Sequence, residues 1–273
     1  MIRMIVSDID GTLMPIGGRM SPRTLDTIRR CAEAGILFVL ASGRTFLNTA
    51  RVALDAGLDC PVISANGGRA DAHPWESPIY EDRMEKETAR RVCDRLLRAG
   101  CFMTSYVGTK VYTLPETNGY GSLCCRVSEA KKGEAFAVES DRLIMKTEGV
   151  KGPYKFEAYS DDKALIDELR SEFISWGMSV SSAFPYNLEI LPPGGGKGKA
   201  VKELAARFGV QKEEIMALGD GSNDVGLLLS AGVRVAMENA VDSLKAVSTH
   251  IAPHVDKDGA AFMIEQIALG ENA

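Results

Sequence analysis

Nearly continuous runs of apolar residues recur near the start of the chain, and amphipathic stretches separate them. The runs cover residues 2–7, 36–42 and 61–66, and such runs are typical of strands that are buried on both faces of a sheet. The first amphipathic stretch opens with Ser21-Pro22, an N-cap followed by proline, and ends at Gly35, so it predicts a helix. A second helix follows. The β-α-β-α-β order predicts a parallel sheet with right-handed crossovers.

The last third of the chain repeats this organisation. Apolar residues recur at i, i+3, i+4 and i+7 between Val201 and Phe208, before Gly209, so this segment predicts a helix that the glycine ends. Short apolar runs then predict further buried strands, at residues 215–220, 233–237 and 249–252.

The middle of the chain has a different pattern. Helices are predicted at 85–99 and 161–176, and the segments KVYTL and YKFEAYS between them are strands of mixed polarity. This pattern predicts an α+β domain inserted into a doubly wound α/β domain. The predicted limits are 1–82 for the first part of the core, 83–188 for the insertion and 189–273 for the second part of the core.

Composition and charge exclude several classes of protein. With 45% apolar and 25% charged residues over 273 positions, the chain has the ordinary mixture of a globular protein with a large core. A net charge of −5 without a basic cluster argues against nucleic-acid binding. The apolar runs are too short for a membrane span, and Asp8 comes too early for a signal peptide. We therefore expect a cytoplasmic protein.

The cysteines agree with a reducing compartment. Six cysteines are scattered without C-x-x-C spacing, so they are expected to be reduced and mostly packed in the interior. The adjacent Cys124 and Cys125 could be redox-active, although nothing else in the sequence supports that role. The three histidines form no zinc-binding pattern with cysteines or with each other.

Polar residues gather where the predicted parallel strands end. The four strand ends carry Asp8-Ile9-Asp10-Gly11-Thr12, Ser42-Gly43-Arg44, Asn66-Gly67-Gly68, and Asp220 with Asn223 and Asp224. Each of these alone would be an ordinary turn. Since ligands of open α/β sheets bind at the carboxyl ends of the strands, four such ends together indicate a binding site.

The chemistry that fits these residues is phosphate transfer at a magnesium ion. Asp8 and Asp10 would repel each other unless a cation lay between them. Mg²⁺ prefers one or two carboxylates together with waters and phosphate oxygens, and the side chains of Asp8 and Asp220 with the Asp10 carbonyl could supply such ligands. A calcium loop is excluded because its later ligands and its closing glutamate are missing.

The glycine-rich segment PPGGGKGKA suggests a P-loop at first sight. The P-loop pattern would need glycine at position 191 or 193 and a Ser or Thr after the lysine, and both are lacking. The segment is instead interpreted as a turn that leads Lys197 into a helix N-terminus. A lysine is unfavourable there for the helix itself, so we expect it to face an anion and several carboxylates.

These pieces, in this order, resemble the haloacid dehalogenase-like hydrolase superfamily, specifically its Cof-type phosphatases with a large C2-type cap (subclass IIB). The segments DIDGTL, ASGR, LEILPPGGGKGKAV and ALGDGSNDVGLLLSAGVRVAMENA resemble the four family motifs. NGG and DKDGAAFMIEQ resemble two further family segments. The resemblance implies a Rossmann-like core with an inserted cap, and the insertion at 83–188 would be that cap. Ser42 stands where threonine is commoner, and Gly226 and Pro253 depart from the usual residues.

The resemblance also implies roles for individual residues. Asp8 would be the nucleophile that becomes an aspartyl-phosphate, and Asp10 the general acid and base. Lys197 and Ser42 would hold the transferring phosphoryl group, and Asn223 and Asp224 would position Lys197 and the groups around the metal. The catalytic set is then Asp8, Asp10 and Lys197. The phosphate-binding and substrate-binding set is Ser42, Gly43, Arg44, Asn66, Gly67 and Asn223. The metal set is Asp8, Asp10, Asp220 and Asp224.

The function predicted in this way is that of a Mg²⁺-dependent phosphatase acting on small phosphomonoesters such as sugar phosphates. Two alternatives remain: a phosphomutase or phosphotransferase on the same scaffold, and a non-catalytic phosphate-binding module. The expected partner is a small phosphorylated metabolite, without nucleic acid or membrane, and the expected oligomeric state is a monomer or weak homodimer. The cap is expected to select the substrate.

Overall fold

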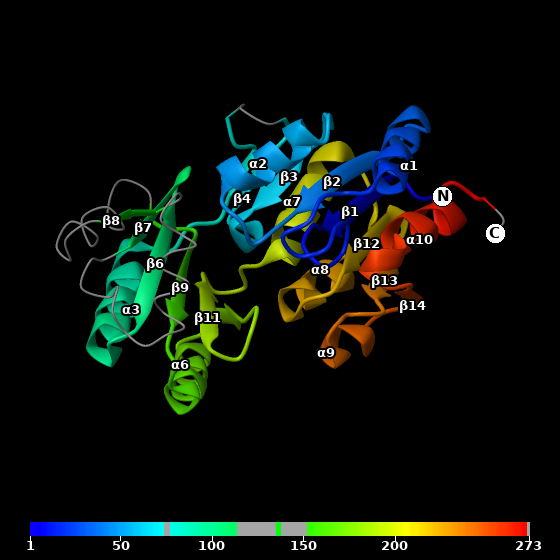
Figure 1. Ribbon diagram of the computed structural model, residues 1–273. Helices are drawn as coiled ribbons and strands as arrows, with labels where there is room; N and C mark the ends of the chain where they lie inside the picture. Colours follow the sequence, from blue (N-terminus) through cyan, green and yellow to red (C-terminus); the bar gives the residue numbers. More distant parts are fainter. Residues whose placement is uncertain (74–76, 114–134, 138–151, 272–273) are drawn as a thin grey trace. The chain divides into compact units, whose positions relative to one another are not determined.

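The computed structural model describes residues 1–73, 77–113, 135–137 and 152–271. The chain forms two compact units (Figure 1). The first unit combines Met1–Glu81 with Gly196–Ala273, and the second unit is Asp82–Gly195. The predicted limits of the cap, 83–188, fall within the second unit, and its role as a cap stays a prediction.

The first unit is built on one eight-stranded sheet in the order β14-β13-β12-β1-β2-β3-β4-β5. Six neighbouring strands of this sheet are parallel, whereas β4 and β5 are antiparallel additions at one edge. The bounds are β1 (Met4–Asp8), β2 (Leu37–Ala41), β3 (Val62–Ser64), β4 (Arg69–Asp71), β5 (Tyr80–Glu81), β12 (Ile215–Gly219), β13 (Val233–Met237) and β14 (His250–Ala252). The predicted doubly wound parallel sheet is confirmed. The two antiparallel strands were not predicted, because three and two residues are too few for a readable pattern.

Helices cover both faces of this sheet. Right-handed crossovers place α1 (Pro22–Glu33) and α2 (Phe46–Asp55) on one face, where α10 (Gly259–Ile267) packs against α1. The opposite face carries α7 (Lys197–Phe208) and α8 (Val225–Leu229), which pack against each other. The short α9 (Asp242–Lys245) joins β13 to β14. The predicted N-cap is present, since the Ser21 side chain accepts a hydrogen bond from the amide of Thr24 (3.1 Å).

The order of strands determines where a ligand can bind in the first unit. In the sheet β1 lies between β2 and β12, and the strands that follow each of these in the chain are added outward, β3 beside β2 and β13 and β14 beyond β12. Every residue of β1 and β12 is buried. The loops after β1 and β12 therefore diverge from the middle of the sheet at its carboxyl edge, the place where open α/β sheets bind ligands.

The second unit has its own mixed sheet, in the order β10-β11-β9-β6-β7-β8. Its strands are β6 (Phe102–Val107), β7 (Lys110–Thr113), β8 (Ala135–Ala137), β9 (Lys155–Tyr159), β10 (Ser179–Ser181) and β11 (Asn187–Leu191). The helices α3 (Lys86–Ala99) and α6 (Lys163–Ser175) share one apolar cluster with alternate residues of the central strands, such as Phe156 and Ala158. Because side chains alternate across a strand, Lys155, Glu157 and Tyr159 point to the other face of the sheet.

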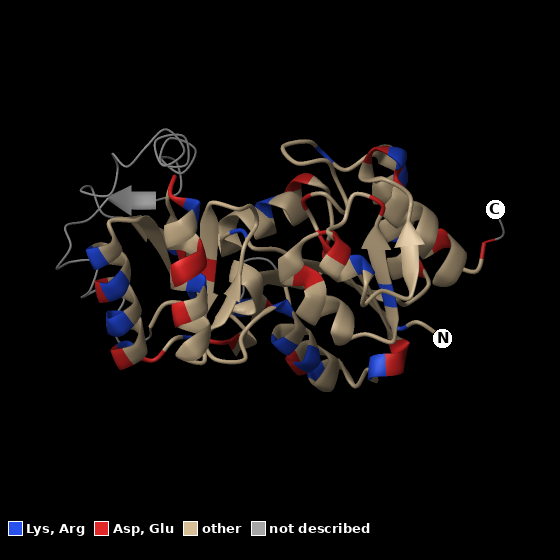
Figure 2. Cartoon of the chain, turned by 90° about the horizontal axis from the view of Figure 1, so that it is seen from below, with Lys and Arg blue, Asp and Glu red and all other residues tan. Residues whose placement is uncertain are grey.

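Other expectations concern charge, cysteines and membranes. Figure 2 shows Lys and Arg intermixed with Asp and Glu on helices of both units. The four described cysteines are buried and form no disulfide with one another, and the Cys124-Cys125 pair lies outside the described residues. Within the described ranges, no helix combines the length and the apolar character that crossing a membrane would require.

Candidate active site

A buried lysine joins two of the predicted strand ends. Lys197, the first residue of α7, donates from its Nζ to Asp8 Oδ1 (2.5 Å) at the end of β1. It also donates to Asp224 Oδ1 (2.7 Å), which follows β12. The lysine is 1% exposed and both carboxylates are buried. Lys197 therefore faces carboxylates, as its position at a helix N-terminus suggested.

The burial of these charges changes their proton affinities. Burial favours the neutral amine of Lys197, but the nearby charges of Asp224 and Asp8 outweigh it, so the pKa of Lys197 is raised. Burial raises the pKa of Asp8 well above its ordinary value, Lys197 opposes this rise, and the charges of Asp224 and Asp220 add to it. The single positive charge of Lys197 thus does not balance the negative charges of the carboxylates around it.

Asp220 is the third carboxylate of this cluster. Its Oδ1 accepts a hydrogen bond from Thr12 Oγ1 (3.0 Å), which links the loop after β1 to the end of β12. Gly11 lies so close that a Cβ atom there would be 2.3 Å from Asp220 Oδ2, and its φ is +81°, so glycine is required at this position. Burial, followed by the charge of Asp224, raises the pKa of Asp220 from 3.8 to about 6.

The donor set of this cluster fits a magnesium ion. Ligand oxygens of Asp8, Asp220 and Asp224 lie within 4.8 Å of one another. Asp224 is already occupied, since Oδ1 binds Lys197 and Oδ2 accepts from the amides of Asp220 (3.1 Å) and Gly221 (2.9 Å). Within the described part of the chain, no hydrogen bond reaches Oδ2 of Asp8 or of Asp220. These two oxygens suit a cation that prefers few carboxylates, and Asp224 orients the lysine and the loop after β12.

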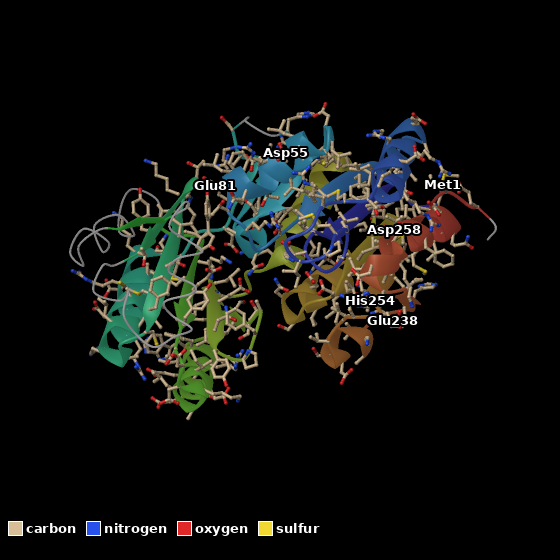
Figure 3. All side chains as sticks on the ribbon, viewed as in Figure 1. Met1, Asp55, Glu81, Glu238, His254 and Asp258 are labelled. Carbon is tan, nitrogen blue, oxygen red and sulfur yellow. The ribbon has the colours of Figure 1, made fainter. Side chains whose placement is uncertain are left out.

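Asp10 makes a different contact from the other aspartates. Its carboxylate lies outside that cluster and forms a bidentate pair with Arg44, from Nε to Oδ2 (2.7 Å) and from the terminal amino group to Oδ1 (2.6 Å). If Asp10 binds the metal, it would therefore do so through its main-chain carbonyl oxygen and not through its carboxylate. Arg44 and Asp55 both line a hollow of about 850 Å³, which also includes other residues of α2. Figure 3 labels Asp55.

The loops after β2 and β3 complete the carboxyl edge. The Ser42 hydroxyl accepts a hydrogen bond from the main-chain amide of Arg44 (3.1 Å). The main-chain amide of Asn66 donates to the Ser42 carbonyl (3.0 Å). Gly43 packs against the Asn66 side chain. At Gly67, φ is +92° and a Cβ atom would lie 2.4 Å from the carbonyl oxygen of Gly196. This close approach joins the loop after β3 to the start of α7.

Asn66 and Asn223 contact each other through their side chains. Asn223 was expected to position Lys197, but its Nδ2 donates instead to Asn66 Oδ1 (3.1 Å). The Asn66 side chain is buried, and its own Nδ2 has no hydrogen-bond partner among the described residues. A buried amide donor without a partner is costly, so Asn66 is suited to bind an anion.

Two residues that contact the site were assigned no role from the sequence. Asn239 donates from Nδ2 to the Gly11 carbonyl (2.8 Å), and Thr12 binds Asp220. Both lie inside quoted motifs, but only the fold shows which strand end each one meets. His254 lies outside the site. Its main-chain amide donates to Glu238 Oε2 (2.9 Å), and both residues are labelled in Figure 3.

Known proteins share this architecture along the whole chain. The sequence profile of the haloacid dehalogenase-like hydrolases matches residues 5–264. The chain is 28% identical over 291 aligned positions to 5-amino-6-(5-phospho-D-ribitylamino)uracil phosphatase YwtE of Bacillus subtilis, with 100% of both chains covered. It is 29% identical to a phosphoglycolate phosphatase of Methanoculleus marisnigri, over 88% of this chain and 86% of that protein.

Solved structures agree at the level of the fold. A haloacid dehalogenase-like hydrolase from B. subtilis has a TM-score of 0.86 at 22% identity, covering 97% of this chain and 100% of that one. The chain therefore belongs to the haloacid dehalogenase-like hydrolases. The predictions of a Cof-type member and of a phosphoric monoester hydrolase are confirmed.

Proposed function

We propose that the chain is a magnesium-dependent phosphatase that hydrolyses small phosphomonoesters through a phosphorylated Asp8. The observation that carries this proposal is the pair between Lys197 and Asp8 (2.5 Å), which orients one carboxylate at the carboxyl edge of the sheet. Membership of the hydrolase family and the phosphatase names of two relatives support it.

The proposed reaction has two steps at phosphorus. In the first step, the Asp8 carboxylate attacks the phosphorus through one of its oxygens, the bond to the ester oxygen breaks, and Asp10 gives its proton to the departing alkoxide. In the second step, Asp10 takes a proton from a water, which attacks the same phosphorus. This attack releases inorganic phosphate and regenerates the Asp8 carboxylate. A covalent intermediate divides one difficult displacement into two easier ones.

The remaining residues hold the transferring group. Lys197 would neutralise one phosphoryl oxygen, and the Ser42 hydroxyl, the Gly43 amide and the Asn66 side chain would donate to the others. Asp8 and Asp220 would hold Mg²⁺, with the Asp10 carbonyl. When bound, the ion supplies positive charge against the carboxylates and the phosphoryl oxygens. Phosphoryl transfer depends mainly on such positioning and charge neutralisation.

The proposed substrates are phosphorylated sugars and polyols. YwtE is named for a substrate with a phosphorylated ribityl group, and the Methanoculleus relative is named for phosphoglycolate. Both names describe a phosphate monoester of an aliphatic alcohol, and the ribityl group of the first is a polyol. We therefore assign this chain to the same chemical class.

A phosphate-release assay tests the proposal. The purified protein is incubated with p-nitrophenyl phosphate and a panel of sugar phosphates, with Mg²⁺, with EDTA, and with Mg²⁺ restored after EDTA. We expect one inorganic phosphate per ester cleaved, loss of turnover on chelation and recovery with Mg²⁺. Asp220→Asn should weaken the response to Mg²⁺, whereas Asp256→Asn, at a largely exposed carboxylate, is the matched control.

Other results would favour the alternatives. Transfer of the phosphoryl group to another hydroxyl without release of phosphate would indicate a phosphomutase. Binding of inorganic phosphate without turnover of any ester in the panel would indicate a non-catalytic module.

A further inference from the structure

Arg44 holds both oxygens of Asp10. The two hydrogen bonds measure 2.7 and 2.6 Å, and they come from one edge of the planar guanidinium. Such a fork fixes the orientation of a carboxylate as well as its position. Among the described residues, Arg44 is the sole side chain that donates to this carboxylate, so the orientation of Asp10 depends on it.

Arg44 itself is held by the loop that it belongs to. Its amide donates to Ser42 Oγ (3.1 Å), and its carbonyl accepts from the amide of Ala65 (2.8 Å). The Arg44 side chain is 31% exposed and that of Asp10 is 29% exposed, so the pair lies at the rim of the site. These contacts fix the main chain of Arg44, and from there its guanidinium reaches a carboxylate that is otherwise partly solvated.

The main chain leaves Asp10 few other restraints. Asp10 makes an isolated bridge with Met14, and the amide of Gly11 donates to the Met14 carbonyl (2.8 Å). These contacts fix the backbone of the turn and not the side-chain torsions. Without Arg44 the carboxylate could rotate among its rotamers.

We propose that Arg44 is a positioning residue, which aims the Asp10 carboxylate at the ester oxygen of the substrate, and that it is not an anchor for the phosphoryl group. This inference rests on the proposed function, in which Asp10 exchanges protons with the leaving group and the attacking water. It replaces the phosphate-binding role that the sequence suggested for Arg44.

The two roles predict different kinetics. A phosphoryl anchor contributes to the binding of inorganic phosphate, so its loss raises the inhibition constant of phosphate. A positioning residue contributes to proton transfer, so its loss lowers kcat. That loss is largest for alkyl phosphates, which have poor leaving groups, and smallest for p-nitrophenyl phosphate, which needs little protonation.

The experiment compares Arg44→Lys and Arg44→Ala with wild type on glycerol phosphate and p-nitrophenyl phosphate. Lysine keeps the charge but cannot form the fork. We expect kcat on glycerol phosphate to fall roughly 10²-fold, the usual cost of a misplaced group, with a much smaller fall on p-nitrophenyl phosphate. The phosphate inhibition constant should stay within about threefold. Added guanidinium should restore part of the activity of Arg44→Ala.

Two further variants sharpen the result. In the Asp10→Asn background, Arg44→Lys should cause no additional loss, because the group that it positions is already missing. Arg51→Lys, at a 76% exposed arginine on α2, is the matched control and should behave like wild type. Thermal unfolding of each variant checks that the fold is retained.

Three results would overturn the inference while leaving the phosphatase proposal intact. These are a tenfold or larger rise in the phosphate inhibition constant, equal losses on the two esters, and independent losses in the double variant. Absence of phosphate release by wild type would instead overturn the proposed function, and this inference with it.

Discussion

Among the described residues, two lysines have fully buried side chains between two carboxylates, one lysine in each unit. Lys197 in the first unit contacts Asp8 and Asp224 at 2.5 and 2.7 Å. Lys155 in the second unit contacts Glu157 and Glu189 at 2.8 and 2.7 Å. The two clusters have nearly the same geometry at the ammonium group, yet their surroundings differ.

The cluster around Lys155 is closed. Glu157 also accepts hydrogen bonds from the side chains of three residues, Thr104 (3.2 Å), Tyr106 (2.9 Å) and Tyr159 (2.8 Å). Glu189 accepts from Ser181 (3.0 Å). Buried ions whose partners are complete support a fold and offer little to a ligand.

The cluster around Lys197 is open by comparison. A third carboxylate, Asp220, belongs to it. Oδ1 of Asp8 and Oδ1 of Asp220 accept hydrogen bonds, but the Oδ2 atom of each receives none from the described residues. Burial and the neighbouring charges raise the pKa of Asp8 and that of Asp220. The comparison teaches that a buried lysine between two carboxylates is not by itself the sign of a binding site, whereas a third carboxylate and oxygens without hydrogen bonds beside it indicate a place for a cation.

The largest difference between the clusters should be in turnover. Asp8→Asn should lower kcat by roughly 10⁴-fold or more, because an amide is a poor nucleophile and a poor Mg²⁺ ligand. Glu157→Gln should act mainly on stability. The measurement is phosphate release from p-nitrophenyl phosphate, with thermal unfolding to confirm that Asp8→Asn folds. Retention of more than a few per cent of activity by Asp8→Asn would refute its role as nucleophile.

The response of stability to Mg²⁺ should also separate the two lysines. Lys155→Met leaves two buried carboxylates without a counter-charge, so it should lower the free energy of unfolding by about 3–5 kcal/mol. Lys197→Met should lower the free energy of unfolding by a similar amount without metal. Mg²⁺ should restore much of this loss, because it binds the carboxylates that have lost their counter-charge. Chemical denaturation with and without Mg²⁺ checks this, and Lys163→Met, at an exposed pair, is the control. Equal rescue of both variants by Mg²⁺ would contradict the comparison.

A smaller effect concerns pH and Asp220. Its pKa is raised from 3.8 to about 6 by burial and by Asp224, so the folded state binds a proton more strongly than the unfolded state. This contribution to stability is complete below pH 3.8 and is lost as pH rises through about 6. The metal-free protein should lose about 3 kcal/mol of stability over this interval, since one pKa unit corresponds to about 1.4 kcal/mol. Asp220→Asn and Mg²⁺-loaded protein should lack that component, and an unchanged pH profile in Asp220→Asn would exclude it.

The smallest expected effect is in the closed cluster. Tyr159→Phe removes one of the donors to Glu157 and should cost about 1 kcal/mol of stability without changing the response to Mg²⁺. Tyr186→Phe, at a 40% exposed tyrosine of the same unit, is the control. A change in Mg²⁺ affinity in Tyr159→Phe would show that the second cluster is part of the metal site after all.

The parallel sheet and its polar strand ends could be predicted from the sequence, because both are local. Apolar runs such as residues 2–7 mark buried strands, and Asp8 and Asp220 follow such runs directly. Lys197 could be predicted because a lysine after a glycine-rich turn is unfavourable unless anions face it.

The contacts between side chains of different strands could not be predicted. In the segment YKFEAYS, Lys155 and Glu157 read as polar positions of a mixed strand, and their burial follows from the pairing of β9 with β6 and β11. The pair of Arg44 and Asp10 depends on the loop after β2 lying beside the loop after β1. Register and loop geometry decide these contacts, and a single sequence does not contain them.

The most direct test of the account is covalent trapping during turnover. Protein with Mg²⁺ is mixed with phosphorus-labelled substrate and quenched in acid within milliseconds, and its peptides are then analysed by mass spectrometry. The account predicts phosphate on the peptide containing Asp8, none on peptides containing Glu157 or Glu189, and none in Asp8→Asn. Turnover by wild type with no phosphorylated peptide, or with the label on another residue, would contradict it.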